Sequence, residues 1–184
     1  MYILGISGSP RKNGNTDLFL KETLKSVECE SKFIALRDLN IKPCDGCESC
    51  STRRSCHIQD DMTLVYEEIK KADAIILASP VYFGSISGQL KEMMDRTLCL
   101  YYGKQLENKI GAALATMGSD GGDLALQAIN KFYQYHHIIF VGGVFGIGGE
   151  KKGAIIRDKE AIEDAKSLGK RILKLHKIIN RSIA

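Results

Sequence analysis

Short, almost continuously apolar runs alternate along this chain with segments in which apolar residues recur every three or four positions. The recurring segments have the period of amphipathic helices and cover residues 16–27, 61–71, 86–98, 122–135 and 158–179. The apolar runs read as parallel strands covered on both faces and cover residues 2–7, 31–36, 74–79, 109–116 and 137–144. This order predicts an α/β fold, a doubly wound five-stranded parallel sheet with right-handed crossovers and helices on both faces.

Two segments interrupt this alternation. Residues 40–60 form a long cysteine-rich insertion after the second strand, and residues 142–153 are rich in glycine and follow the fifth. Long irregular loops in a compact domain are usually functional or mobile. Since the 184 residues contain no repeat or linker, we expect a single domain over residues 1–184 with the insertion inside it.

Charge and hydropathy exclude several classes of function. The net charge of +4 is too small to indicate nucleic-acid binding. The longest apolar stretches are far too short to span a bilayer, and the first apolar run lacks the basic leader of a signal peptide. We therefore expect a cytoplasmic protein, where thiols stay reduced and six cysteines indicate metal or redox chemistry.

The segment GSPRKNGNT, residues 8–16, joins the first strand to the first helix and is called the phosphate loop below. The Ser9 and Thr16 hydroxyls, with the free N–H groups at the helix start, can surround an anion. The Asn15 amide adds donors, and Arg11 adds a forked charge suited to phosphate oxygens. The loop is neither a Walker loop nor a dinucleotide fingerprint. A plain turn with a helix cap is the alternative.

Three segments in order resemble the NADPH-dependent FMN reductase and iron–sulfur flavoprotein group of the flavodoxin-like fold. They are GISGSPRKNGNT at residues 5–16, ASPVYFGS at 78–85 and GQLKEMMDRT at 88–97, with a weaker similarity in TMGSDGG at 116–122. The resemblance implies the strand order 2-1-3-4-5 and a first loop that holds the 5′-phosphate of FMN. It also implies assembly as a homodimer or homotetramer.

The carboxyl ends of strands one, three and four meet beside the switch point of such a sheet, where ligands bind. We expect the flavin ring there, and the resemblance places the backbone amides of residues 81–84 at its pyrimidine edge. Beyond the first loop, the expected flavin-binding residues are Pro80, Val81, Tyr82, Phe83, Gly84, Thr116, Gly118, Gly121 and Gly122. Tyr82 or Phe83 supplies an aromatic face in this interpretation, whereas the alternative places both in the core. The lack of Trp favours an open ring face and a reductase-like enzyme over a simple carrier.

Four cysteines in the insertion, Cys44, Cys47, Cys50 and Cys56, follow the spacing C-x2-C-x2-C-x5-C. Thiolates this close suit the corners of one [4Fe–4S] cluster. The resemblance to the iron–sulfur flavoproteins likewise assigns them as ligands of a cluster that accompanies FMN. A zinc site of four thiolates is one alternative, although such sites usually pair two separated knuckles. The other alternative is that these cysteines bind nothing, or form disulfides in air. Cys29 and Cys99 receive no role.

No set of side chains indicates acid–base or nucleophilic catalysis, so we expect the cofactors to carry the chemistry. The leading hypothesis is an iron–sulfur flavoprotein that transfers electrons through FMN and the cluster. The resemblance implies ferredoxin or NAD(P)H as donor, and acceptors such as quinones, oxygen or peroxide. The alternatives are a cluster-free NAD(P)H-dependent FMN reductase and a flavin-based redox sensor whose cysteine loop is the switch.

Overall fold

A computed structural model describes residues 1–183, and residue 184, the last of the predicted domain, lies outside the described residues. In this part of the chain five parallel strands form one sheet in the order β2-β1-β3-β4-β5. They are β1 (Tyr2–Ser7), β2 (Glu30–Ala35), β3 (Ala74–Pro80), β4 (Ile110–Met117) and β5 (Ile139–Ile147). The predicted doubly wound parallel sheet and its strand order are confirmed.

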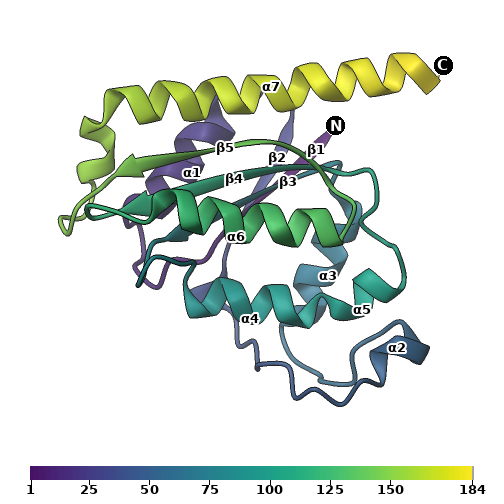
Figure 1. Cartoon of the computed structure of the whole chain (residues 1–184). Helices are drawn as coiled ribbons and strands as arrows, with labels where there is room; N and C mark the ends of the chain where they lie inside the picture. Colours follow the sequence, from purple (N-terminus) through teal and green to yellow (C-terminus); the bar gives the residue numbers. More distant parts are fainter. Residues whose placement is uncertain (184) are drawn as a thin grey trace.

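Helices cover both faces of this sheet (Figure 1). They are α1 (Asn15–Lys25), α2 (Cys50–Arg53), α3 (Met62–Lys71), α4 (Gly88–Arg96), α5 (Leu98–Tyr102), α6 (Gly122–Tyr135) and α7 (Lys159–Ile183), with 3-10 turns η1 (Leu36–Asp38) and η2 (Ala154–Arg157). Successive side chains of a strand point to opposite faces. Accordingly Ile3 packs with residues of α1 and α7, whereas Leu4 packs with residues of α3, α4 and α6.

The helix predicted over residues 86–98 is two helices. The α4 helix ends at Arg96 and α5 starts at Leu98, because the buried hydroxyl of Thr97 between them donates to the Met94 carbonyl at 2.6 Å. Threonine in this role competes with the backbone for the hydrogen bonds that would continue a helix. The apolar period runs unbroken across the junction, so it could not reveal the break.

The glycine-rich segment 142–153 is only partly irregular. Its first six residues belong to β5, which is three residues longer than the predicted strand end at residue 144. A Cβ at Gly146 would lie 2.6 Å from the Ile155 side chain, so glycine at this strand position lets η2 pack directly on β5. Because glycine does not count as apolar, the same glycines hide this end of the strand from a prediction based on apolar runs.

Residues 40–60 leave the end of η1 and return at α3. Figure 1 shows this cysteine loop beneath α4 and α5, outside the helical layer and away from the sheet. It contains the short helix α2, which was not predicted. Among residues 1–183, no helix is both long and apolar enough to cross a membrane.

Candidate functional sites: a phosphate-loop cavity and a cysteine-lined cavity

A cavity of about 200 Å³ opens beyond the carboxyl ends of β1, β3 and β4. Nine of the thirteen residues predicted to bind the flavin line it: Ser9, Arg11, Asn15, Thr16, Pro80, Val81, Tyr82, Thr116 and Gly118. Sequence reasoning missed three other lining residues, Met117, Gly149 and Glu150. The richness of segment 142–153 in glycine was the signal that could have found the last two.

The phosphate loop ends in an anion-binding helix start. The hydrogen-bond ladder of α1 begins where the Leu18 N–H donates to the Gly14 carbonyl, so the first-turn N–H groups have no acceptor within the helix. These groups and the positive end of the helix dipole attract phosphate. The buried hydroxyls of Thr16 and Thr116 lie 2.5 Å apart and join the loop to β4. Backbone donors and hydroxyls around one cavity fit the phosphate of FMN.

The Asn15 side chain is engaged by the protein itself. Its Nδ2 donates to the carbonyls of Gly148 at 2.9 Å and Lys151 at 3.1 Å, and its Oδ1 accepts the Ile155 N–H at 3.3 Å. The Arg11 guanidinium also donates to a carbonyl of this segment, at residue 150. The Asn15 amide therefore ties the segment after β5 to the phosphate loop, a role that the sequence did not suggest.

A buried ion pair lies under the phosphate loop. The fully buried Asp17 carboxylate accepts the Ser7 hydroxyl at 2.7 Å and the Asn13 N–H at 2.8 Å. Arg37, just after β2, donates to both Asp17 oxygens at 3.0 Å and to the Ser9 carbonyl at 3.2 Å. A buried carboxylate is tolerated when it is paired and hydrogen-bonded in this way. Sequence reasoning missed this pair because only the pairing of β1 with β2 brings it together.

A tight turn follows β3 at residues 82–85. Its two central residues, Phe83 and Gly84, have φ of 50° and 69°, as a type I′ turn requires. A positive φ is uncommon for a bulky residue and marks backbone strain. Phe83 is fully exposed, and Tyr82 is 44% exposed and lines the cavity. The alternative that placed both aromatic residues in the core is therefore wrong.

Two of the four backbone amides predicted to contact the flavin are occupied. The Val81 N–H donates to the Thr116 carbonyl at 2.9 Å, and the Tyr82 N–H donates to the Ser85 carbonyl at 2.9 Å. Within the described residues, the amides of the next two positions, 83 and 84, have no acceptor. These two donors are the ones that remain available to a ligand.

The other four predicted residues, Phe83, Gly84, Gly121 and Gly122, do not line the cavity. Gly121 has φ of 83°, and a Cβ there would lie 2.9 Å from the Gly84 Cα and 3.1 Å from the Val81 Cγ1. A Cβ at Gly122 would lie 2.7 Å from the Phe145 ring. Gly121 therefore lets the loops after β3 and β4 pack against each other, and Gly122 lets the start of α6 pack against Phe145 of β5.

The four predicted cluster ligands line one small cavity of about 50 Å³ beside the α4–α5 junction, and Cys99 is a fifth cysteine in its wall. Cys44 and Cys47 are exposed, Cys50 and Cys56 are half-buried, and Cys99 is buried. Four thiols from one short segment around one cavity fit a [4Fe–4S] cluster, whose corners each bind a separate thiolate.

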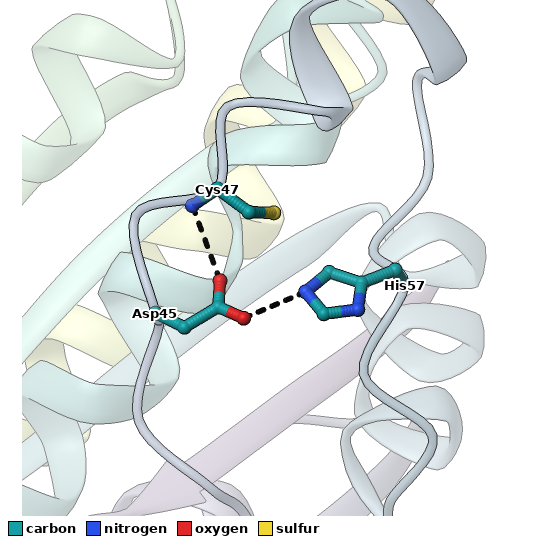
Figure 2. A group of neighbouring side chains, drawn as sticks. All are labelled: Asp45, Cys47 and His57. Atoms are coloured by element: carbon teal, nitrogen blue, oxygen red, sulfur yellow. Dashed lines mark hydrogen bonds and ion pairs between the residues drawn. The ribbon is translucent and has the colours of Figure 1, made fainter.

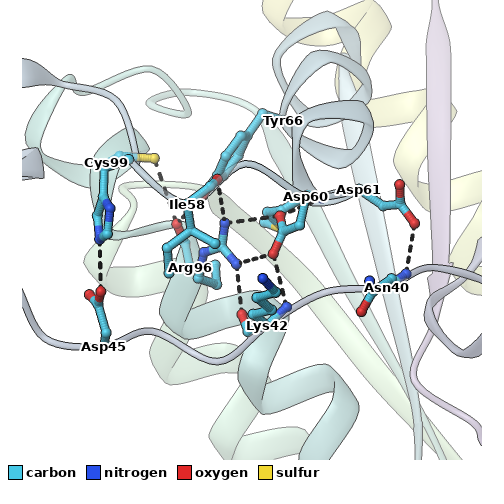
Figure 3. Close-up of polar contacts among 11 residues, drawn as sticks. Asn40, Lys42, Asp45, Ile58, Asp60, Asp61, Tyr66, Arg96 and Cys99 are labelled. Carbon is cyan, nitrogen blue, oxygen red and sulfur yellow. Dashed lines mark hydrogen bonds and ion pairs between the residues drawn. The ribbon is translucent and has the colours of Figure 1, made fainter.

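Both ends of the cysteine loop are held by one buried side chain, Arg96 (Figure 3). Its Nη1 donates to the Lys42 carbonyl and to Asp60 Oδ2, both at 2.6 Å. Its Nη2 donates to Asp60 Oδ1 at 3.1 Å and to the Ile58 carbonyl at 3.3 Å. Burial works to raise the pKa of Asp60, but the bonds from Arg96 and from two backbone N–H groups outweigh it and lower that pKa.

Inside the loop, the Asp45 carboxylate accepts the Cys47 N–H at 3.2 Å and lies 2.8 Å from His57 Nε2 (Figure 2). Among the described residues, this exposed trio is the only set of three or more candidate metal-ligand atoms within 4.8 Å of one another. A tetrahedral zinc site would bring its sulfurs within about 4 Å of one another. In the described residues no three cysteine sulfurs lie within 4.8 Å of one another, which does not favour the zinc alternative.

Two thiols of the cavity, those of Cys50 and Cys99, are not activated nucleophiles. Burial raises the pKa of Cys50, and neighbouring cysteines raise it further. Burial also raises the pKa of Cys99. Reactive cysteines show the opposite shift, because a positive neighbour or a helix start stabilises their thiolates. These two thiols therefore do not favour the redox-switch hypothesis.

The sheet order and the phosphate cavity at its switch point define a protein with the flavodoxin-like fold. Solved structures share it. An archaeal flavodoxin has a TM-score of 0.63 and 17% identity, over 96% of this chain and 99% of that protein. The NAD(P)H:quinone oxidoreductase of Methanothermobacter marburgensis has a TM-score of 0.67 and 16% identity, over 95% and 97%.

The sequence matches the NADPH-dependent FMN reductase family over residues 1–152. It is 40% identical to an iron–sulfur flavoprotein of Methanocaldococcus jannaschii over 98% of this chain and 100% of that protein. It is 37% identical to one of Archaeoglobus fulgidus over 97% and 94%. The chain therefore belongs to the NADPH-dependent FMN reductase family, in its iron–sulfur flavoprotein group, and it is an FMN-dependent oxidoreductase.

Proposed function

We propose that this protein transfers electrons between FMN and a [4Fe–4S] cluster that is held by Cys44, Cys47, Cys50 and Cys56. The observation that carries the proposal is the cavity that these four cysteines line together. FMN supplies two-electron chemistry and the cluster supplies single-electron steps. The donor is ferredoxin or NAD(P)H, and the acceptor is a protein or a small oxidant such as a quinone, oxygen or peroxide.

In this proposal the phosphate loop binds the FMN phosphate through the first-turn N–H groups of α1 and the hydroxyls of Ser9 and Thr16. Arg11 supplies a positive charge beside them. The ring lies along residues 80–82 on one side and residues 116–118 on the other. The free amides of Phe83 and Gly84, next to the cavity wall, would supply donors to its pyrimidine edge, where such donors favour the reduced flavin.

The first experiment is purification without oxygen, followed by an absorption spectrum and assays of flavin, iron and acid-labile sulfide. The expected result is FMN near one per chain, with about four iron and four sulfide per chain. FMN without iron or sulfide, in protein never exposed to air, would exclude the cluster and leave the cluster-free NAD(P)H-dependent FMN reductase. That second function is favoured by the half-exposed Tyr82 at the cavity wall, which leaves space for a nicotinamide.

Electron transfer between the two sites involves a second copy of the chain in this proposal. Figure 1 shows α2 and the cysteine loop at the end of the molecule opposite the arrowheads of β4 and β5, where the flavin cavity opens. A homodimer or homotetramer can bring the cysteine loop of one copy to the flavin of another. Sedimentation of the loaded protein, with stopped-flow reduction followed at flavin and cluster wavelengths, tests this. A monomer with rapid flavin-to-cluster transfer contradicts it.

A further inference from the structure

Arg96 has an unused hydrogen-bond donor beside the cysteine cavity. Its side chain is fully buried at the end of α4, and it lines the same cavity as the four cysteines. Its two Nη atoms are occupied by Asp60 and by the carbonyls of Lys42 and Ile58. Its Nε is buried and has no partner within the described residues.

A buried donor without an acceptor is costly, and more so when the group is charged. The cavity that Arg96 lines is also lined by five cysteines, whose sulfurs can accept such a bond. Burial works to lower the pKa of Arg96, but the Asp60 carboxylate and the neighbouring Tyr66 and Cys56 side chains outweigh burial and raise it. Cys56 and Arg96 thus interact and line the same cavity.

Arg37 offers a comparison within the same chain. It too pairs with a buried aspartate and has a buried Nε without a partner in the described residues. It does not line the phosphate-loop cavity, and it stands under the loop instead of beside a ligand site. In the described residues, Arg96 thus combines an unused Nε with a place in the wall of the cysteine cavity, whereas Arg37 does not line the phosphate-loop cavity.

We propose that Arg96 Nε–H donates a hydrogen bond to a sulfur of the [4Fe–4S] cluster, on the side of the Cys56 thiolate, and so raises the reduction potential of the cluster. This inference rests on the proposed function. A hydrogen bond to a cluster sulfur stabilises the reduced form, because that form carries more negative charge. Arg96 is then a positioning residue with two tasks, holding both ends of the cysteine loop and setting the potential of the group inside it.

The test is a spectroelectrochemical titration of anaerobically purified wild-type protein and the variants Arg96→Lys and Arg37→Lys. Lysine keeps a positive charge for Asp60 and removes the Nε donor. The expected result for Arg96→Lys is a more negative cluster potential with an unchanged flavin potential, and for Arg37→Lys an unchanged cluster potential. Arg96→Lys protein with a full cluster at the wild-type potential overturns the proposal, because a purely structural role would change iron content alone.

A second measurement decides the case if Arg96→Lys protein holds no iron. Wild-type protein is labelled with ¹⁵N-arginine, its cluster is reduced, and electron–nuclear double resonance is recorded in H₂O and D₂O. A hyperfine coupling to an arginine ¹⁵N and to an exchangeable proton supports the hydrogen bond, and its absence overturns it. Wild-type protein without iron and sulfide would remove the proposed function and this inference together, whereas an intact cluster with no coupling overturns only this inference.

Discussion

The phosphate loop and the cysteine loop are held by the same kind of interaction, and they differ in how much of each loop that interaction fixes. Each rests on a buried arginine–aspartate pair, Arg37 with Asp17 and Arg96 with Asp60. Asp17 also binds the Ser7 hydroxyl and the Asn13 amide, so the pair fixes the loop itself. Arg96 binds only the two ends of the cysteine loop and leaves Cys44 and Cys47 exposed. The phosphate loop is therefore fixed along its length by the protein, whereas the cysteine loop is fixed at its two ends.

The largest effect is expected for a cysteine variant that loses the iron of the cysteine loop and keeps the FMN of the phosphate loop. Cys50→Ser should lower the iron content strongly, because it removes one of the four thiolates that hold the cluster in the proposed function. FMN should remain near one per chain, since the phosphate loop does not depend on the cysteine loop. Iron, sulfide and flavin assays measure both. Cys29→Ser, at a half-buried cysteine outside the cavity, is the control and should keep the iron. A Cys50→Ser protein with full iron would remove this residue from the ligand set.

The second prediction concerns variants that break each of the two ion pairs in turn. Asp17→Ala and Asp60→Ala each leave a buried arginine unpaired, which should lower the free energy of unfolding by about 3–5 kcal/mol. We expect Asp17→Ala to weaken FMN binding while the protein keeps its iron, and Asp60→Ala to do the opposite. Urea unfolding and flavin and iron titrations of both variants check this. If both variants lost both cofactors equally, the two loops would not be independent.

The third prediction concerns pH and the helical layer beside the cysteine loop. His136 is buried, with Nε2 3.0 Å from the Thr97 hydroxyl, and burial lowers its pKa to about 4 from 6.5. Because the folded pKa lies below the unfolded one, its contribution to stability is complete above about pH 6.5 and is lost as the pH falls toward 4. The loss between pH 7 and pH 5 should be about 2 kcal/mol.

Urea unfolding of the wild type and of His136→Gln at pH 7 and pH 5 measures this loss. Glutamine keeps a polar group near Thr97 and cannot titrate, so the difference between the two pH values should shrink in the variant. An equal acid sensitivity in both proteins would assign the effect to other groups.

The smallest effect is expected at Asn15. Asn15→Ala removes the bonds to Gly148, Lys151 and Ile155 and leaves the part-buried backbone groups of Gly148 and Ile155 unpaired, which should cost about 1–3 kcal/mol of unfolding free energy. FMN affinity should fall modestly, because the segment after β5 is no longer tied to the phosphate loop. Fluorescence titration of FMN measures it. Asn13→Gly, in the same loop, is the control and should have less effect, because Asp17 accepts only the backbone N–H of Asn13 and glycine tolerates its φ of 51°. A large loss of affinity with unchanged stability would instead indicate that the Asn15 amide touches the phosphate.

Local chemistry made much of this protein predictable. Continuous apolar runs indicated buried parallel strands, and the phosphate loop stood out because anion binding needs small residues before a helix start. The break at Thr97 and the extension of β5 through Gly146 were not predictable, because a hydroxyl bond and a close helix–strand contact decide them. The sequence also left open whether the Phe83 side chain is buried or exposed. Only the turn geometry shows that its side chain points into solvent.

The sequence by itself determined the strand-and-helix order, the phosphate loop and the cysteine spacing, since each depends on residues close together along the chain. The tertiary structure alone decided that Asp17 meets Arg37 and that Arg96 meets both Asp60 and the four cysteines. These pairs join elements separated by tens of residues, and no local period encodes such a meeting. The physical reason is that burying a charge is tolerated only where the fold supplies its partner, which is a property of the packed sheet and helices.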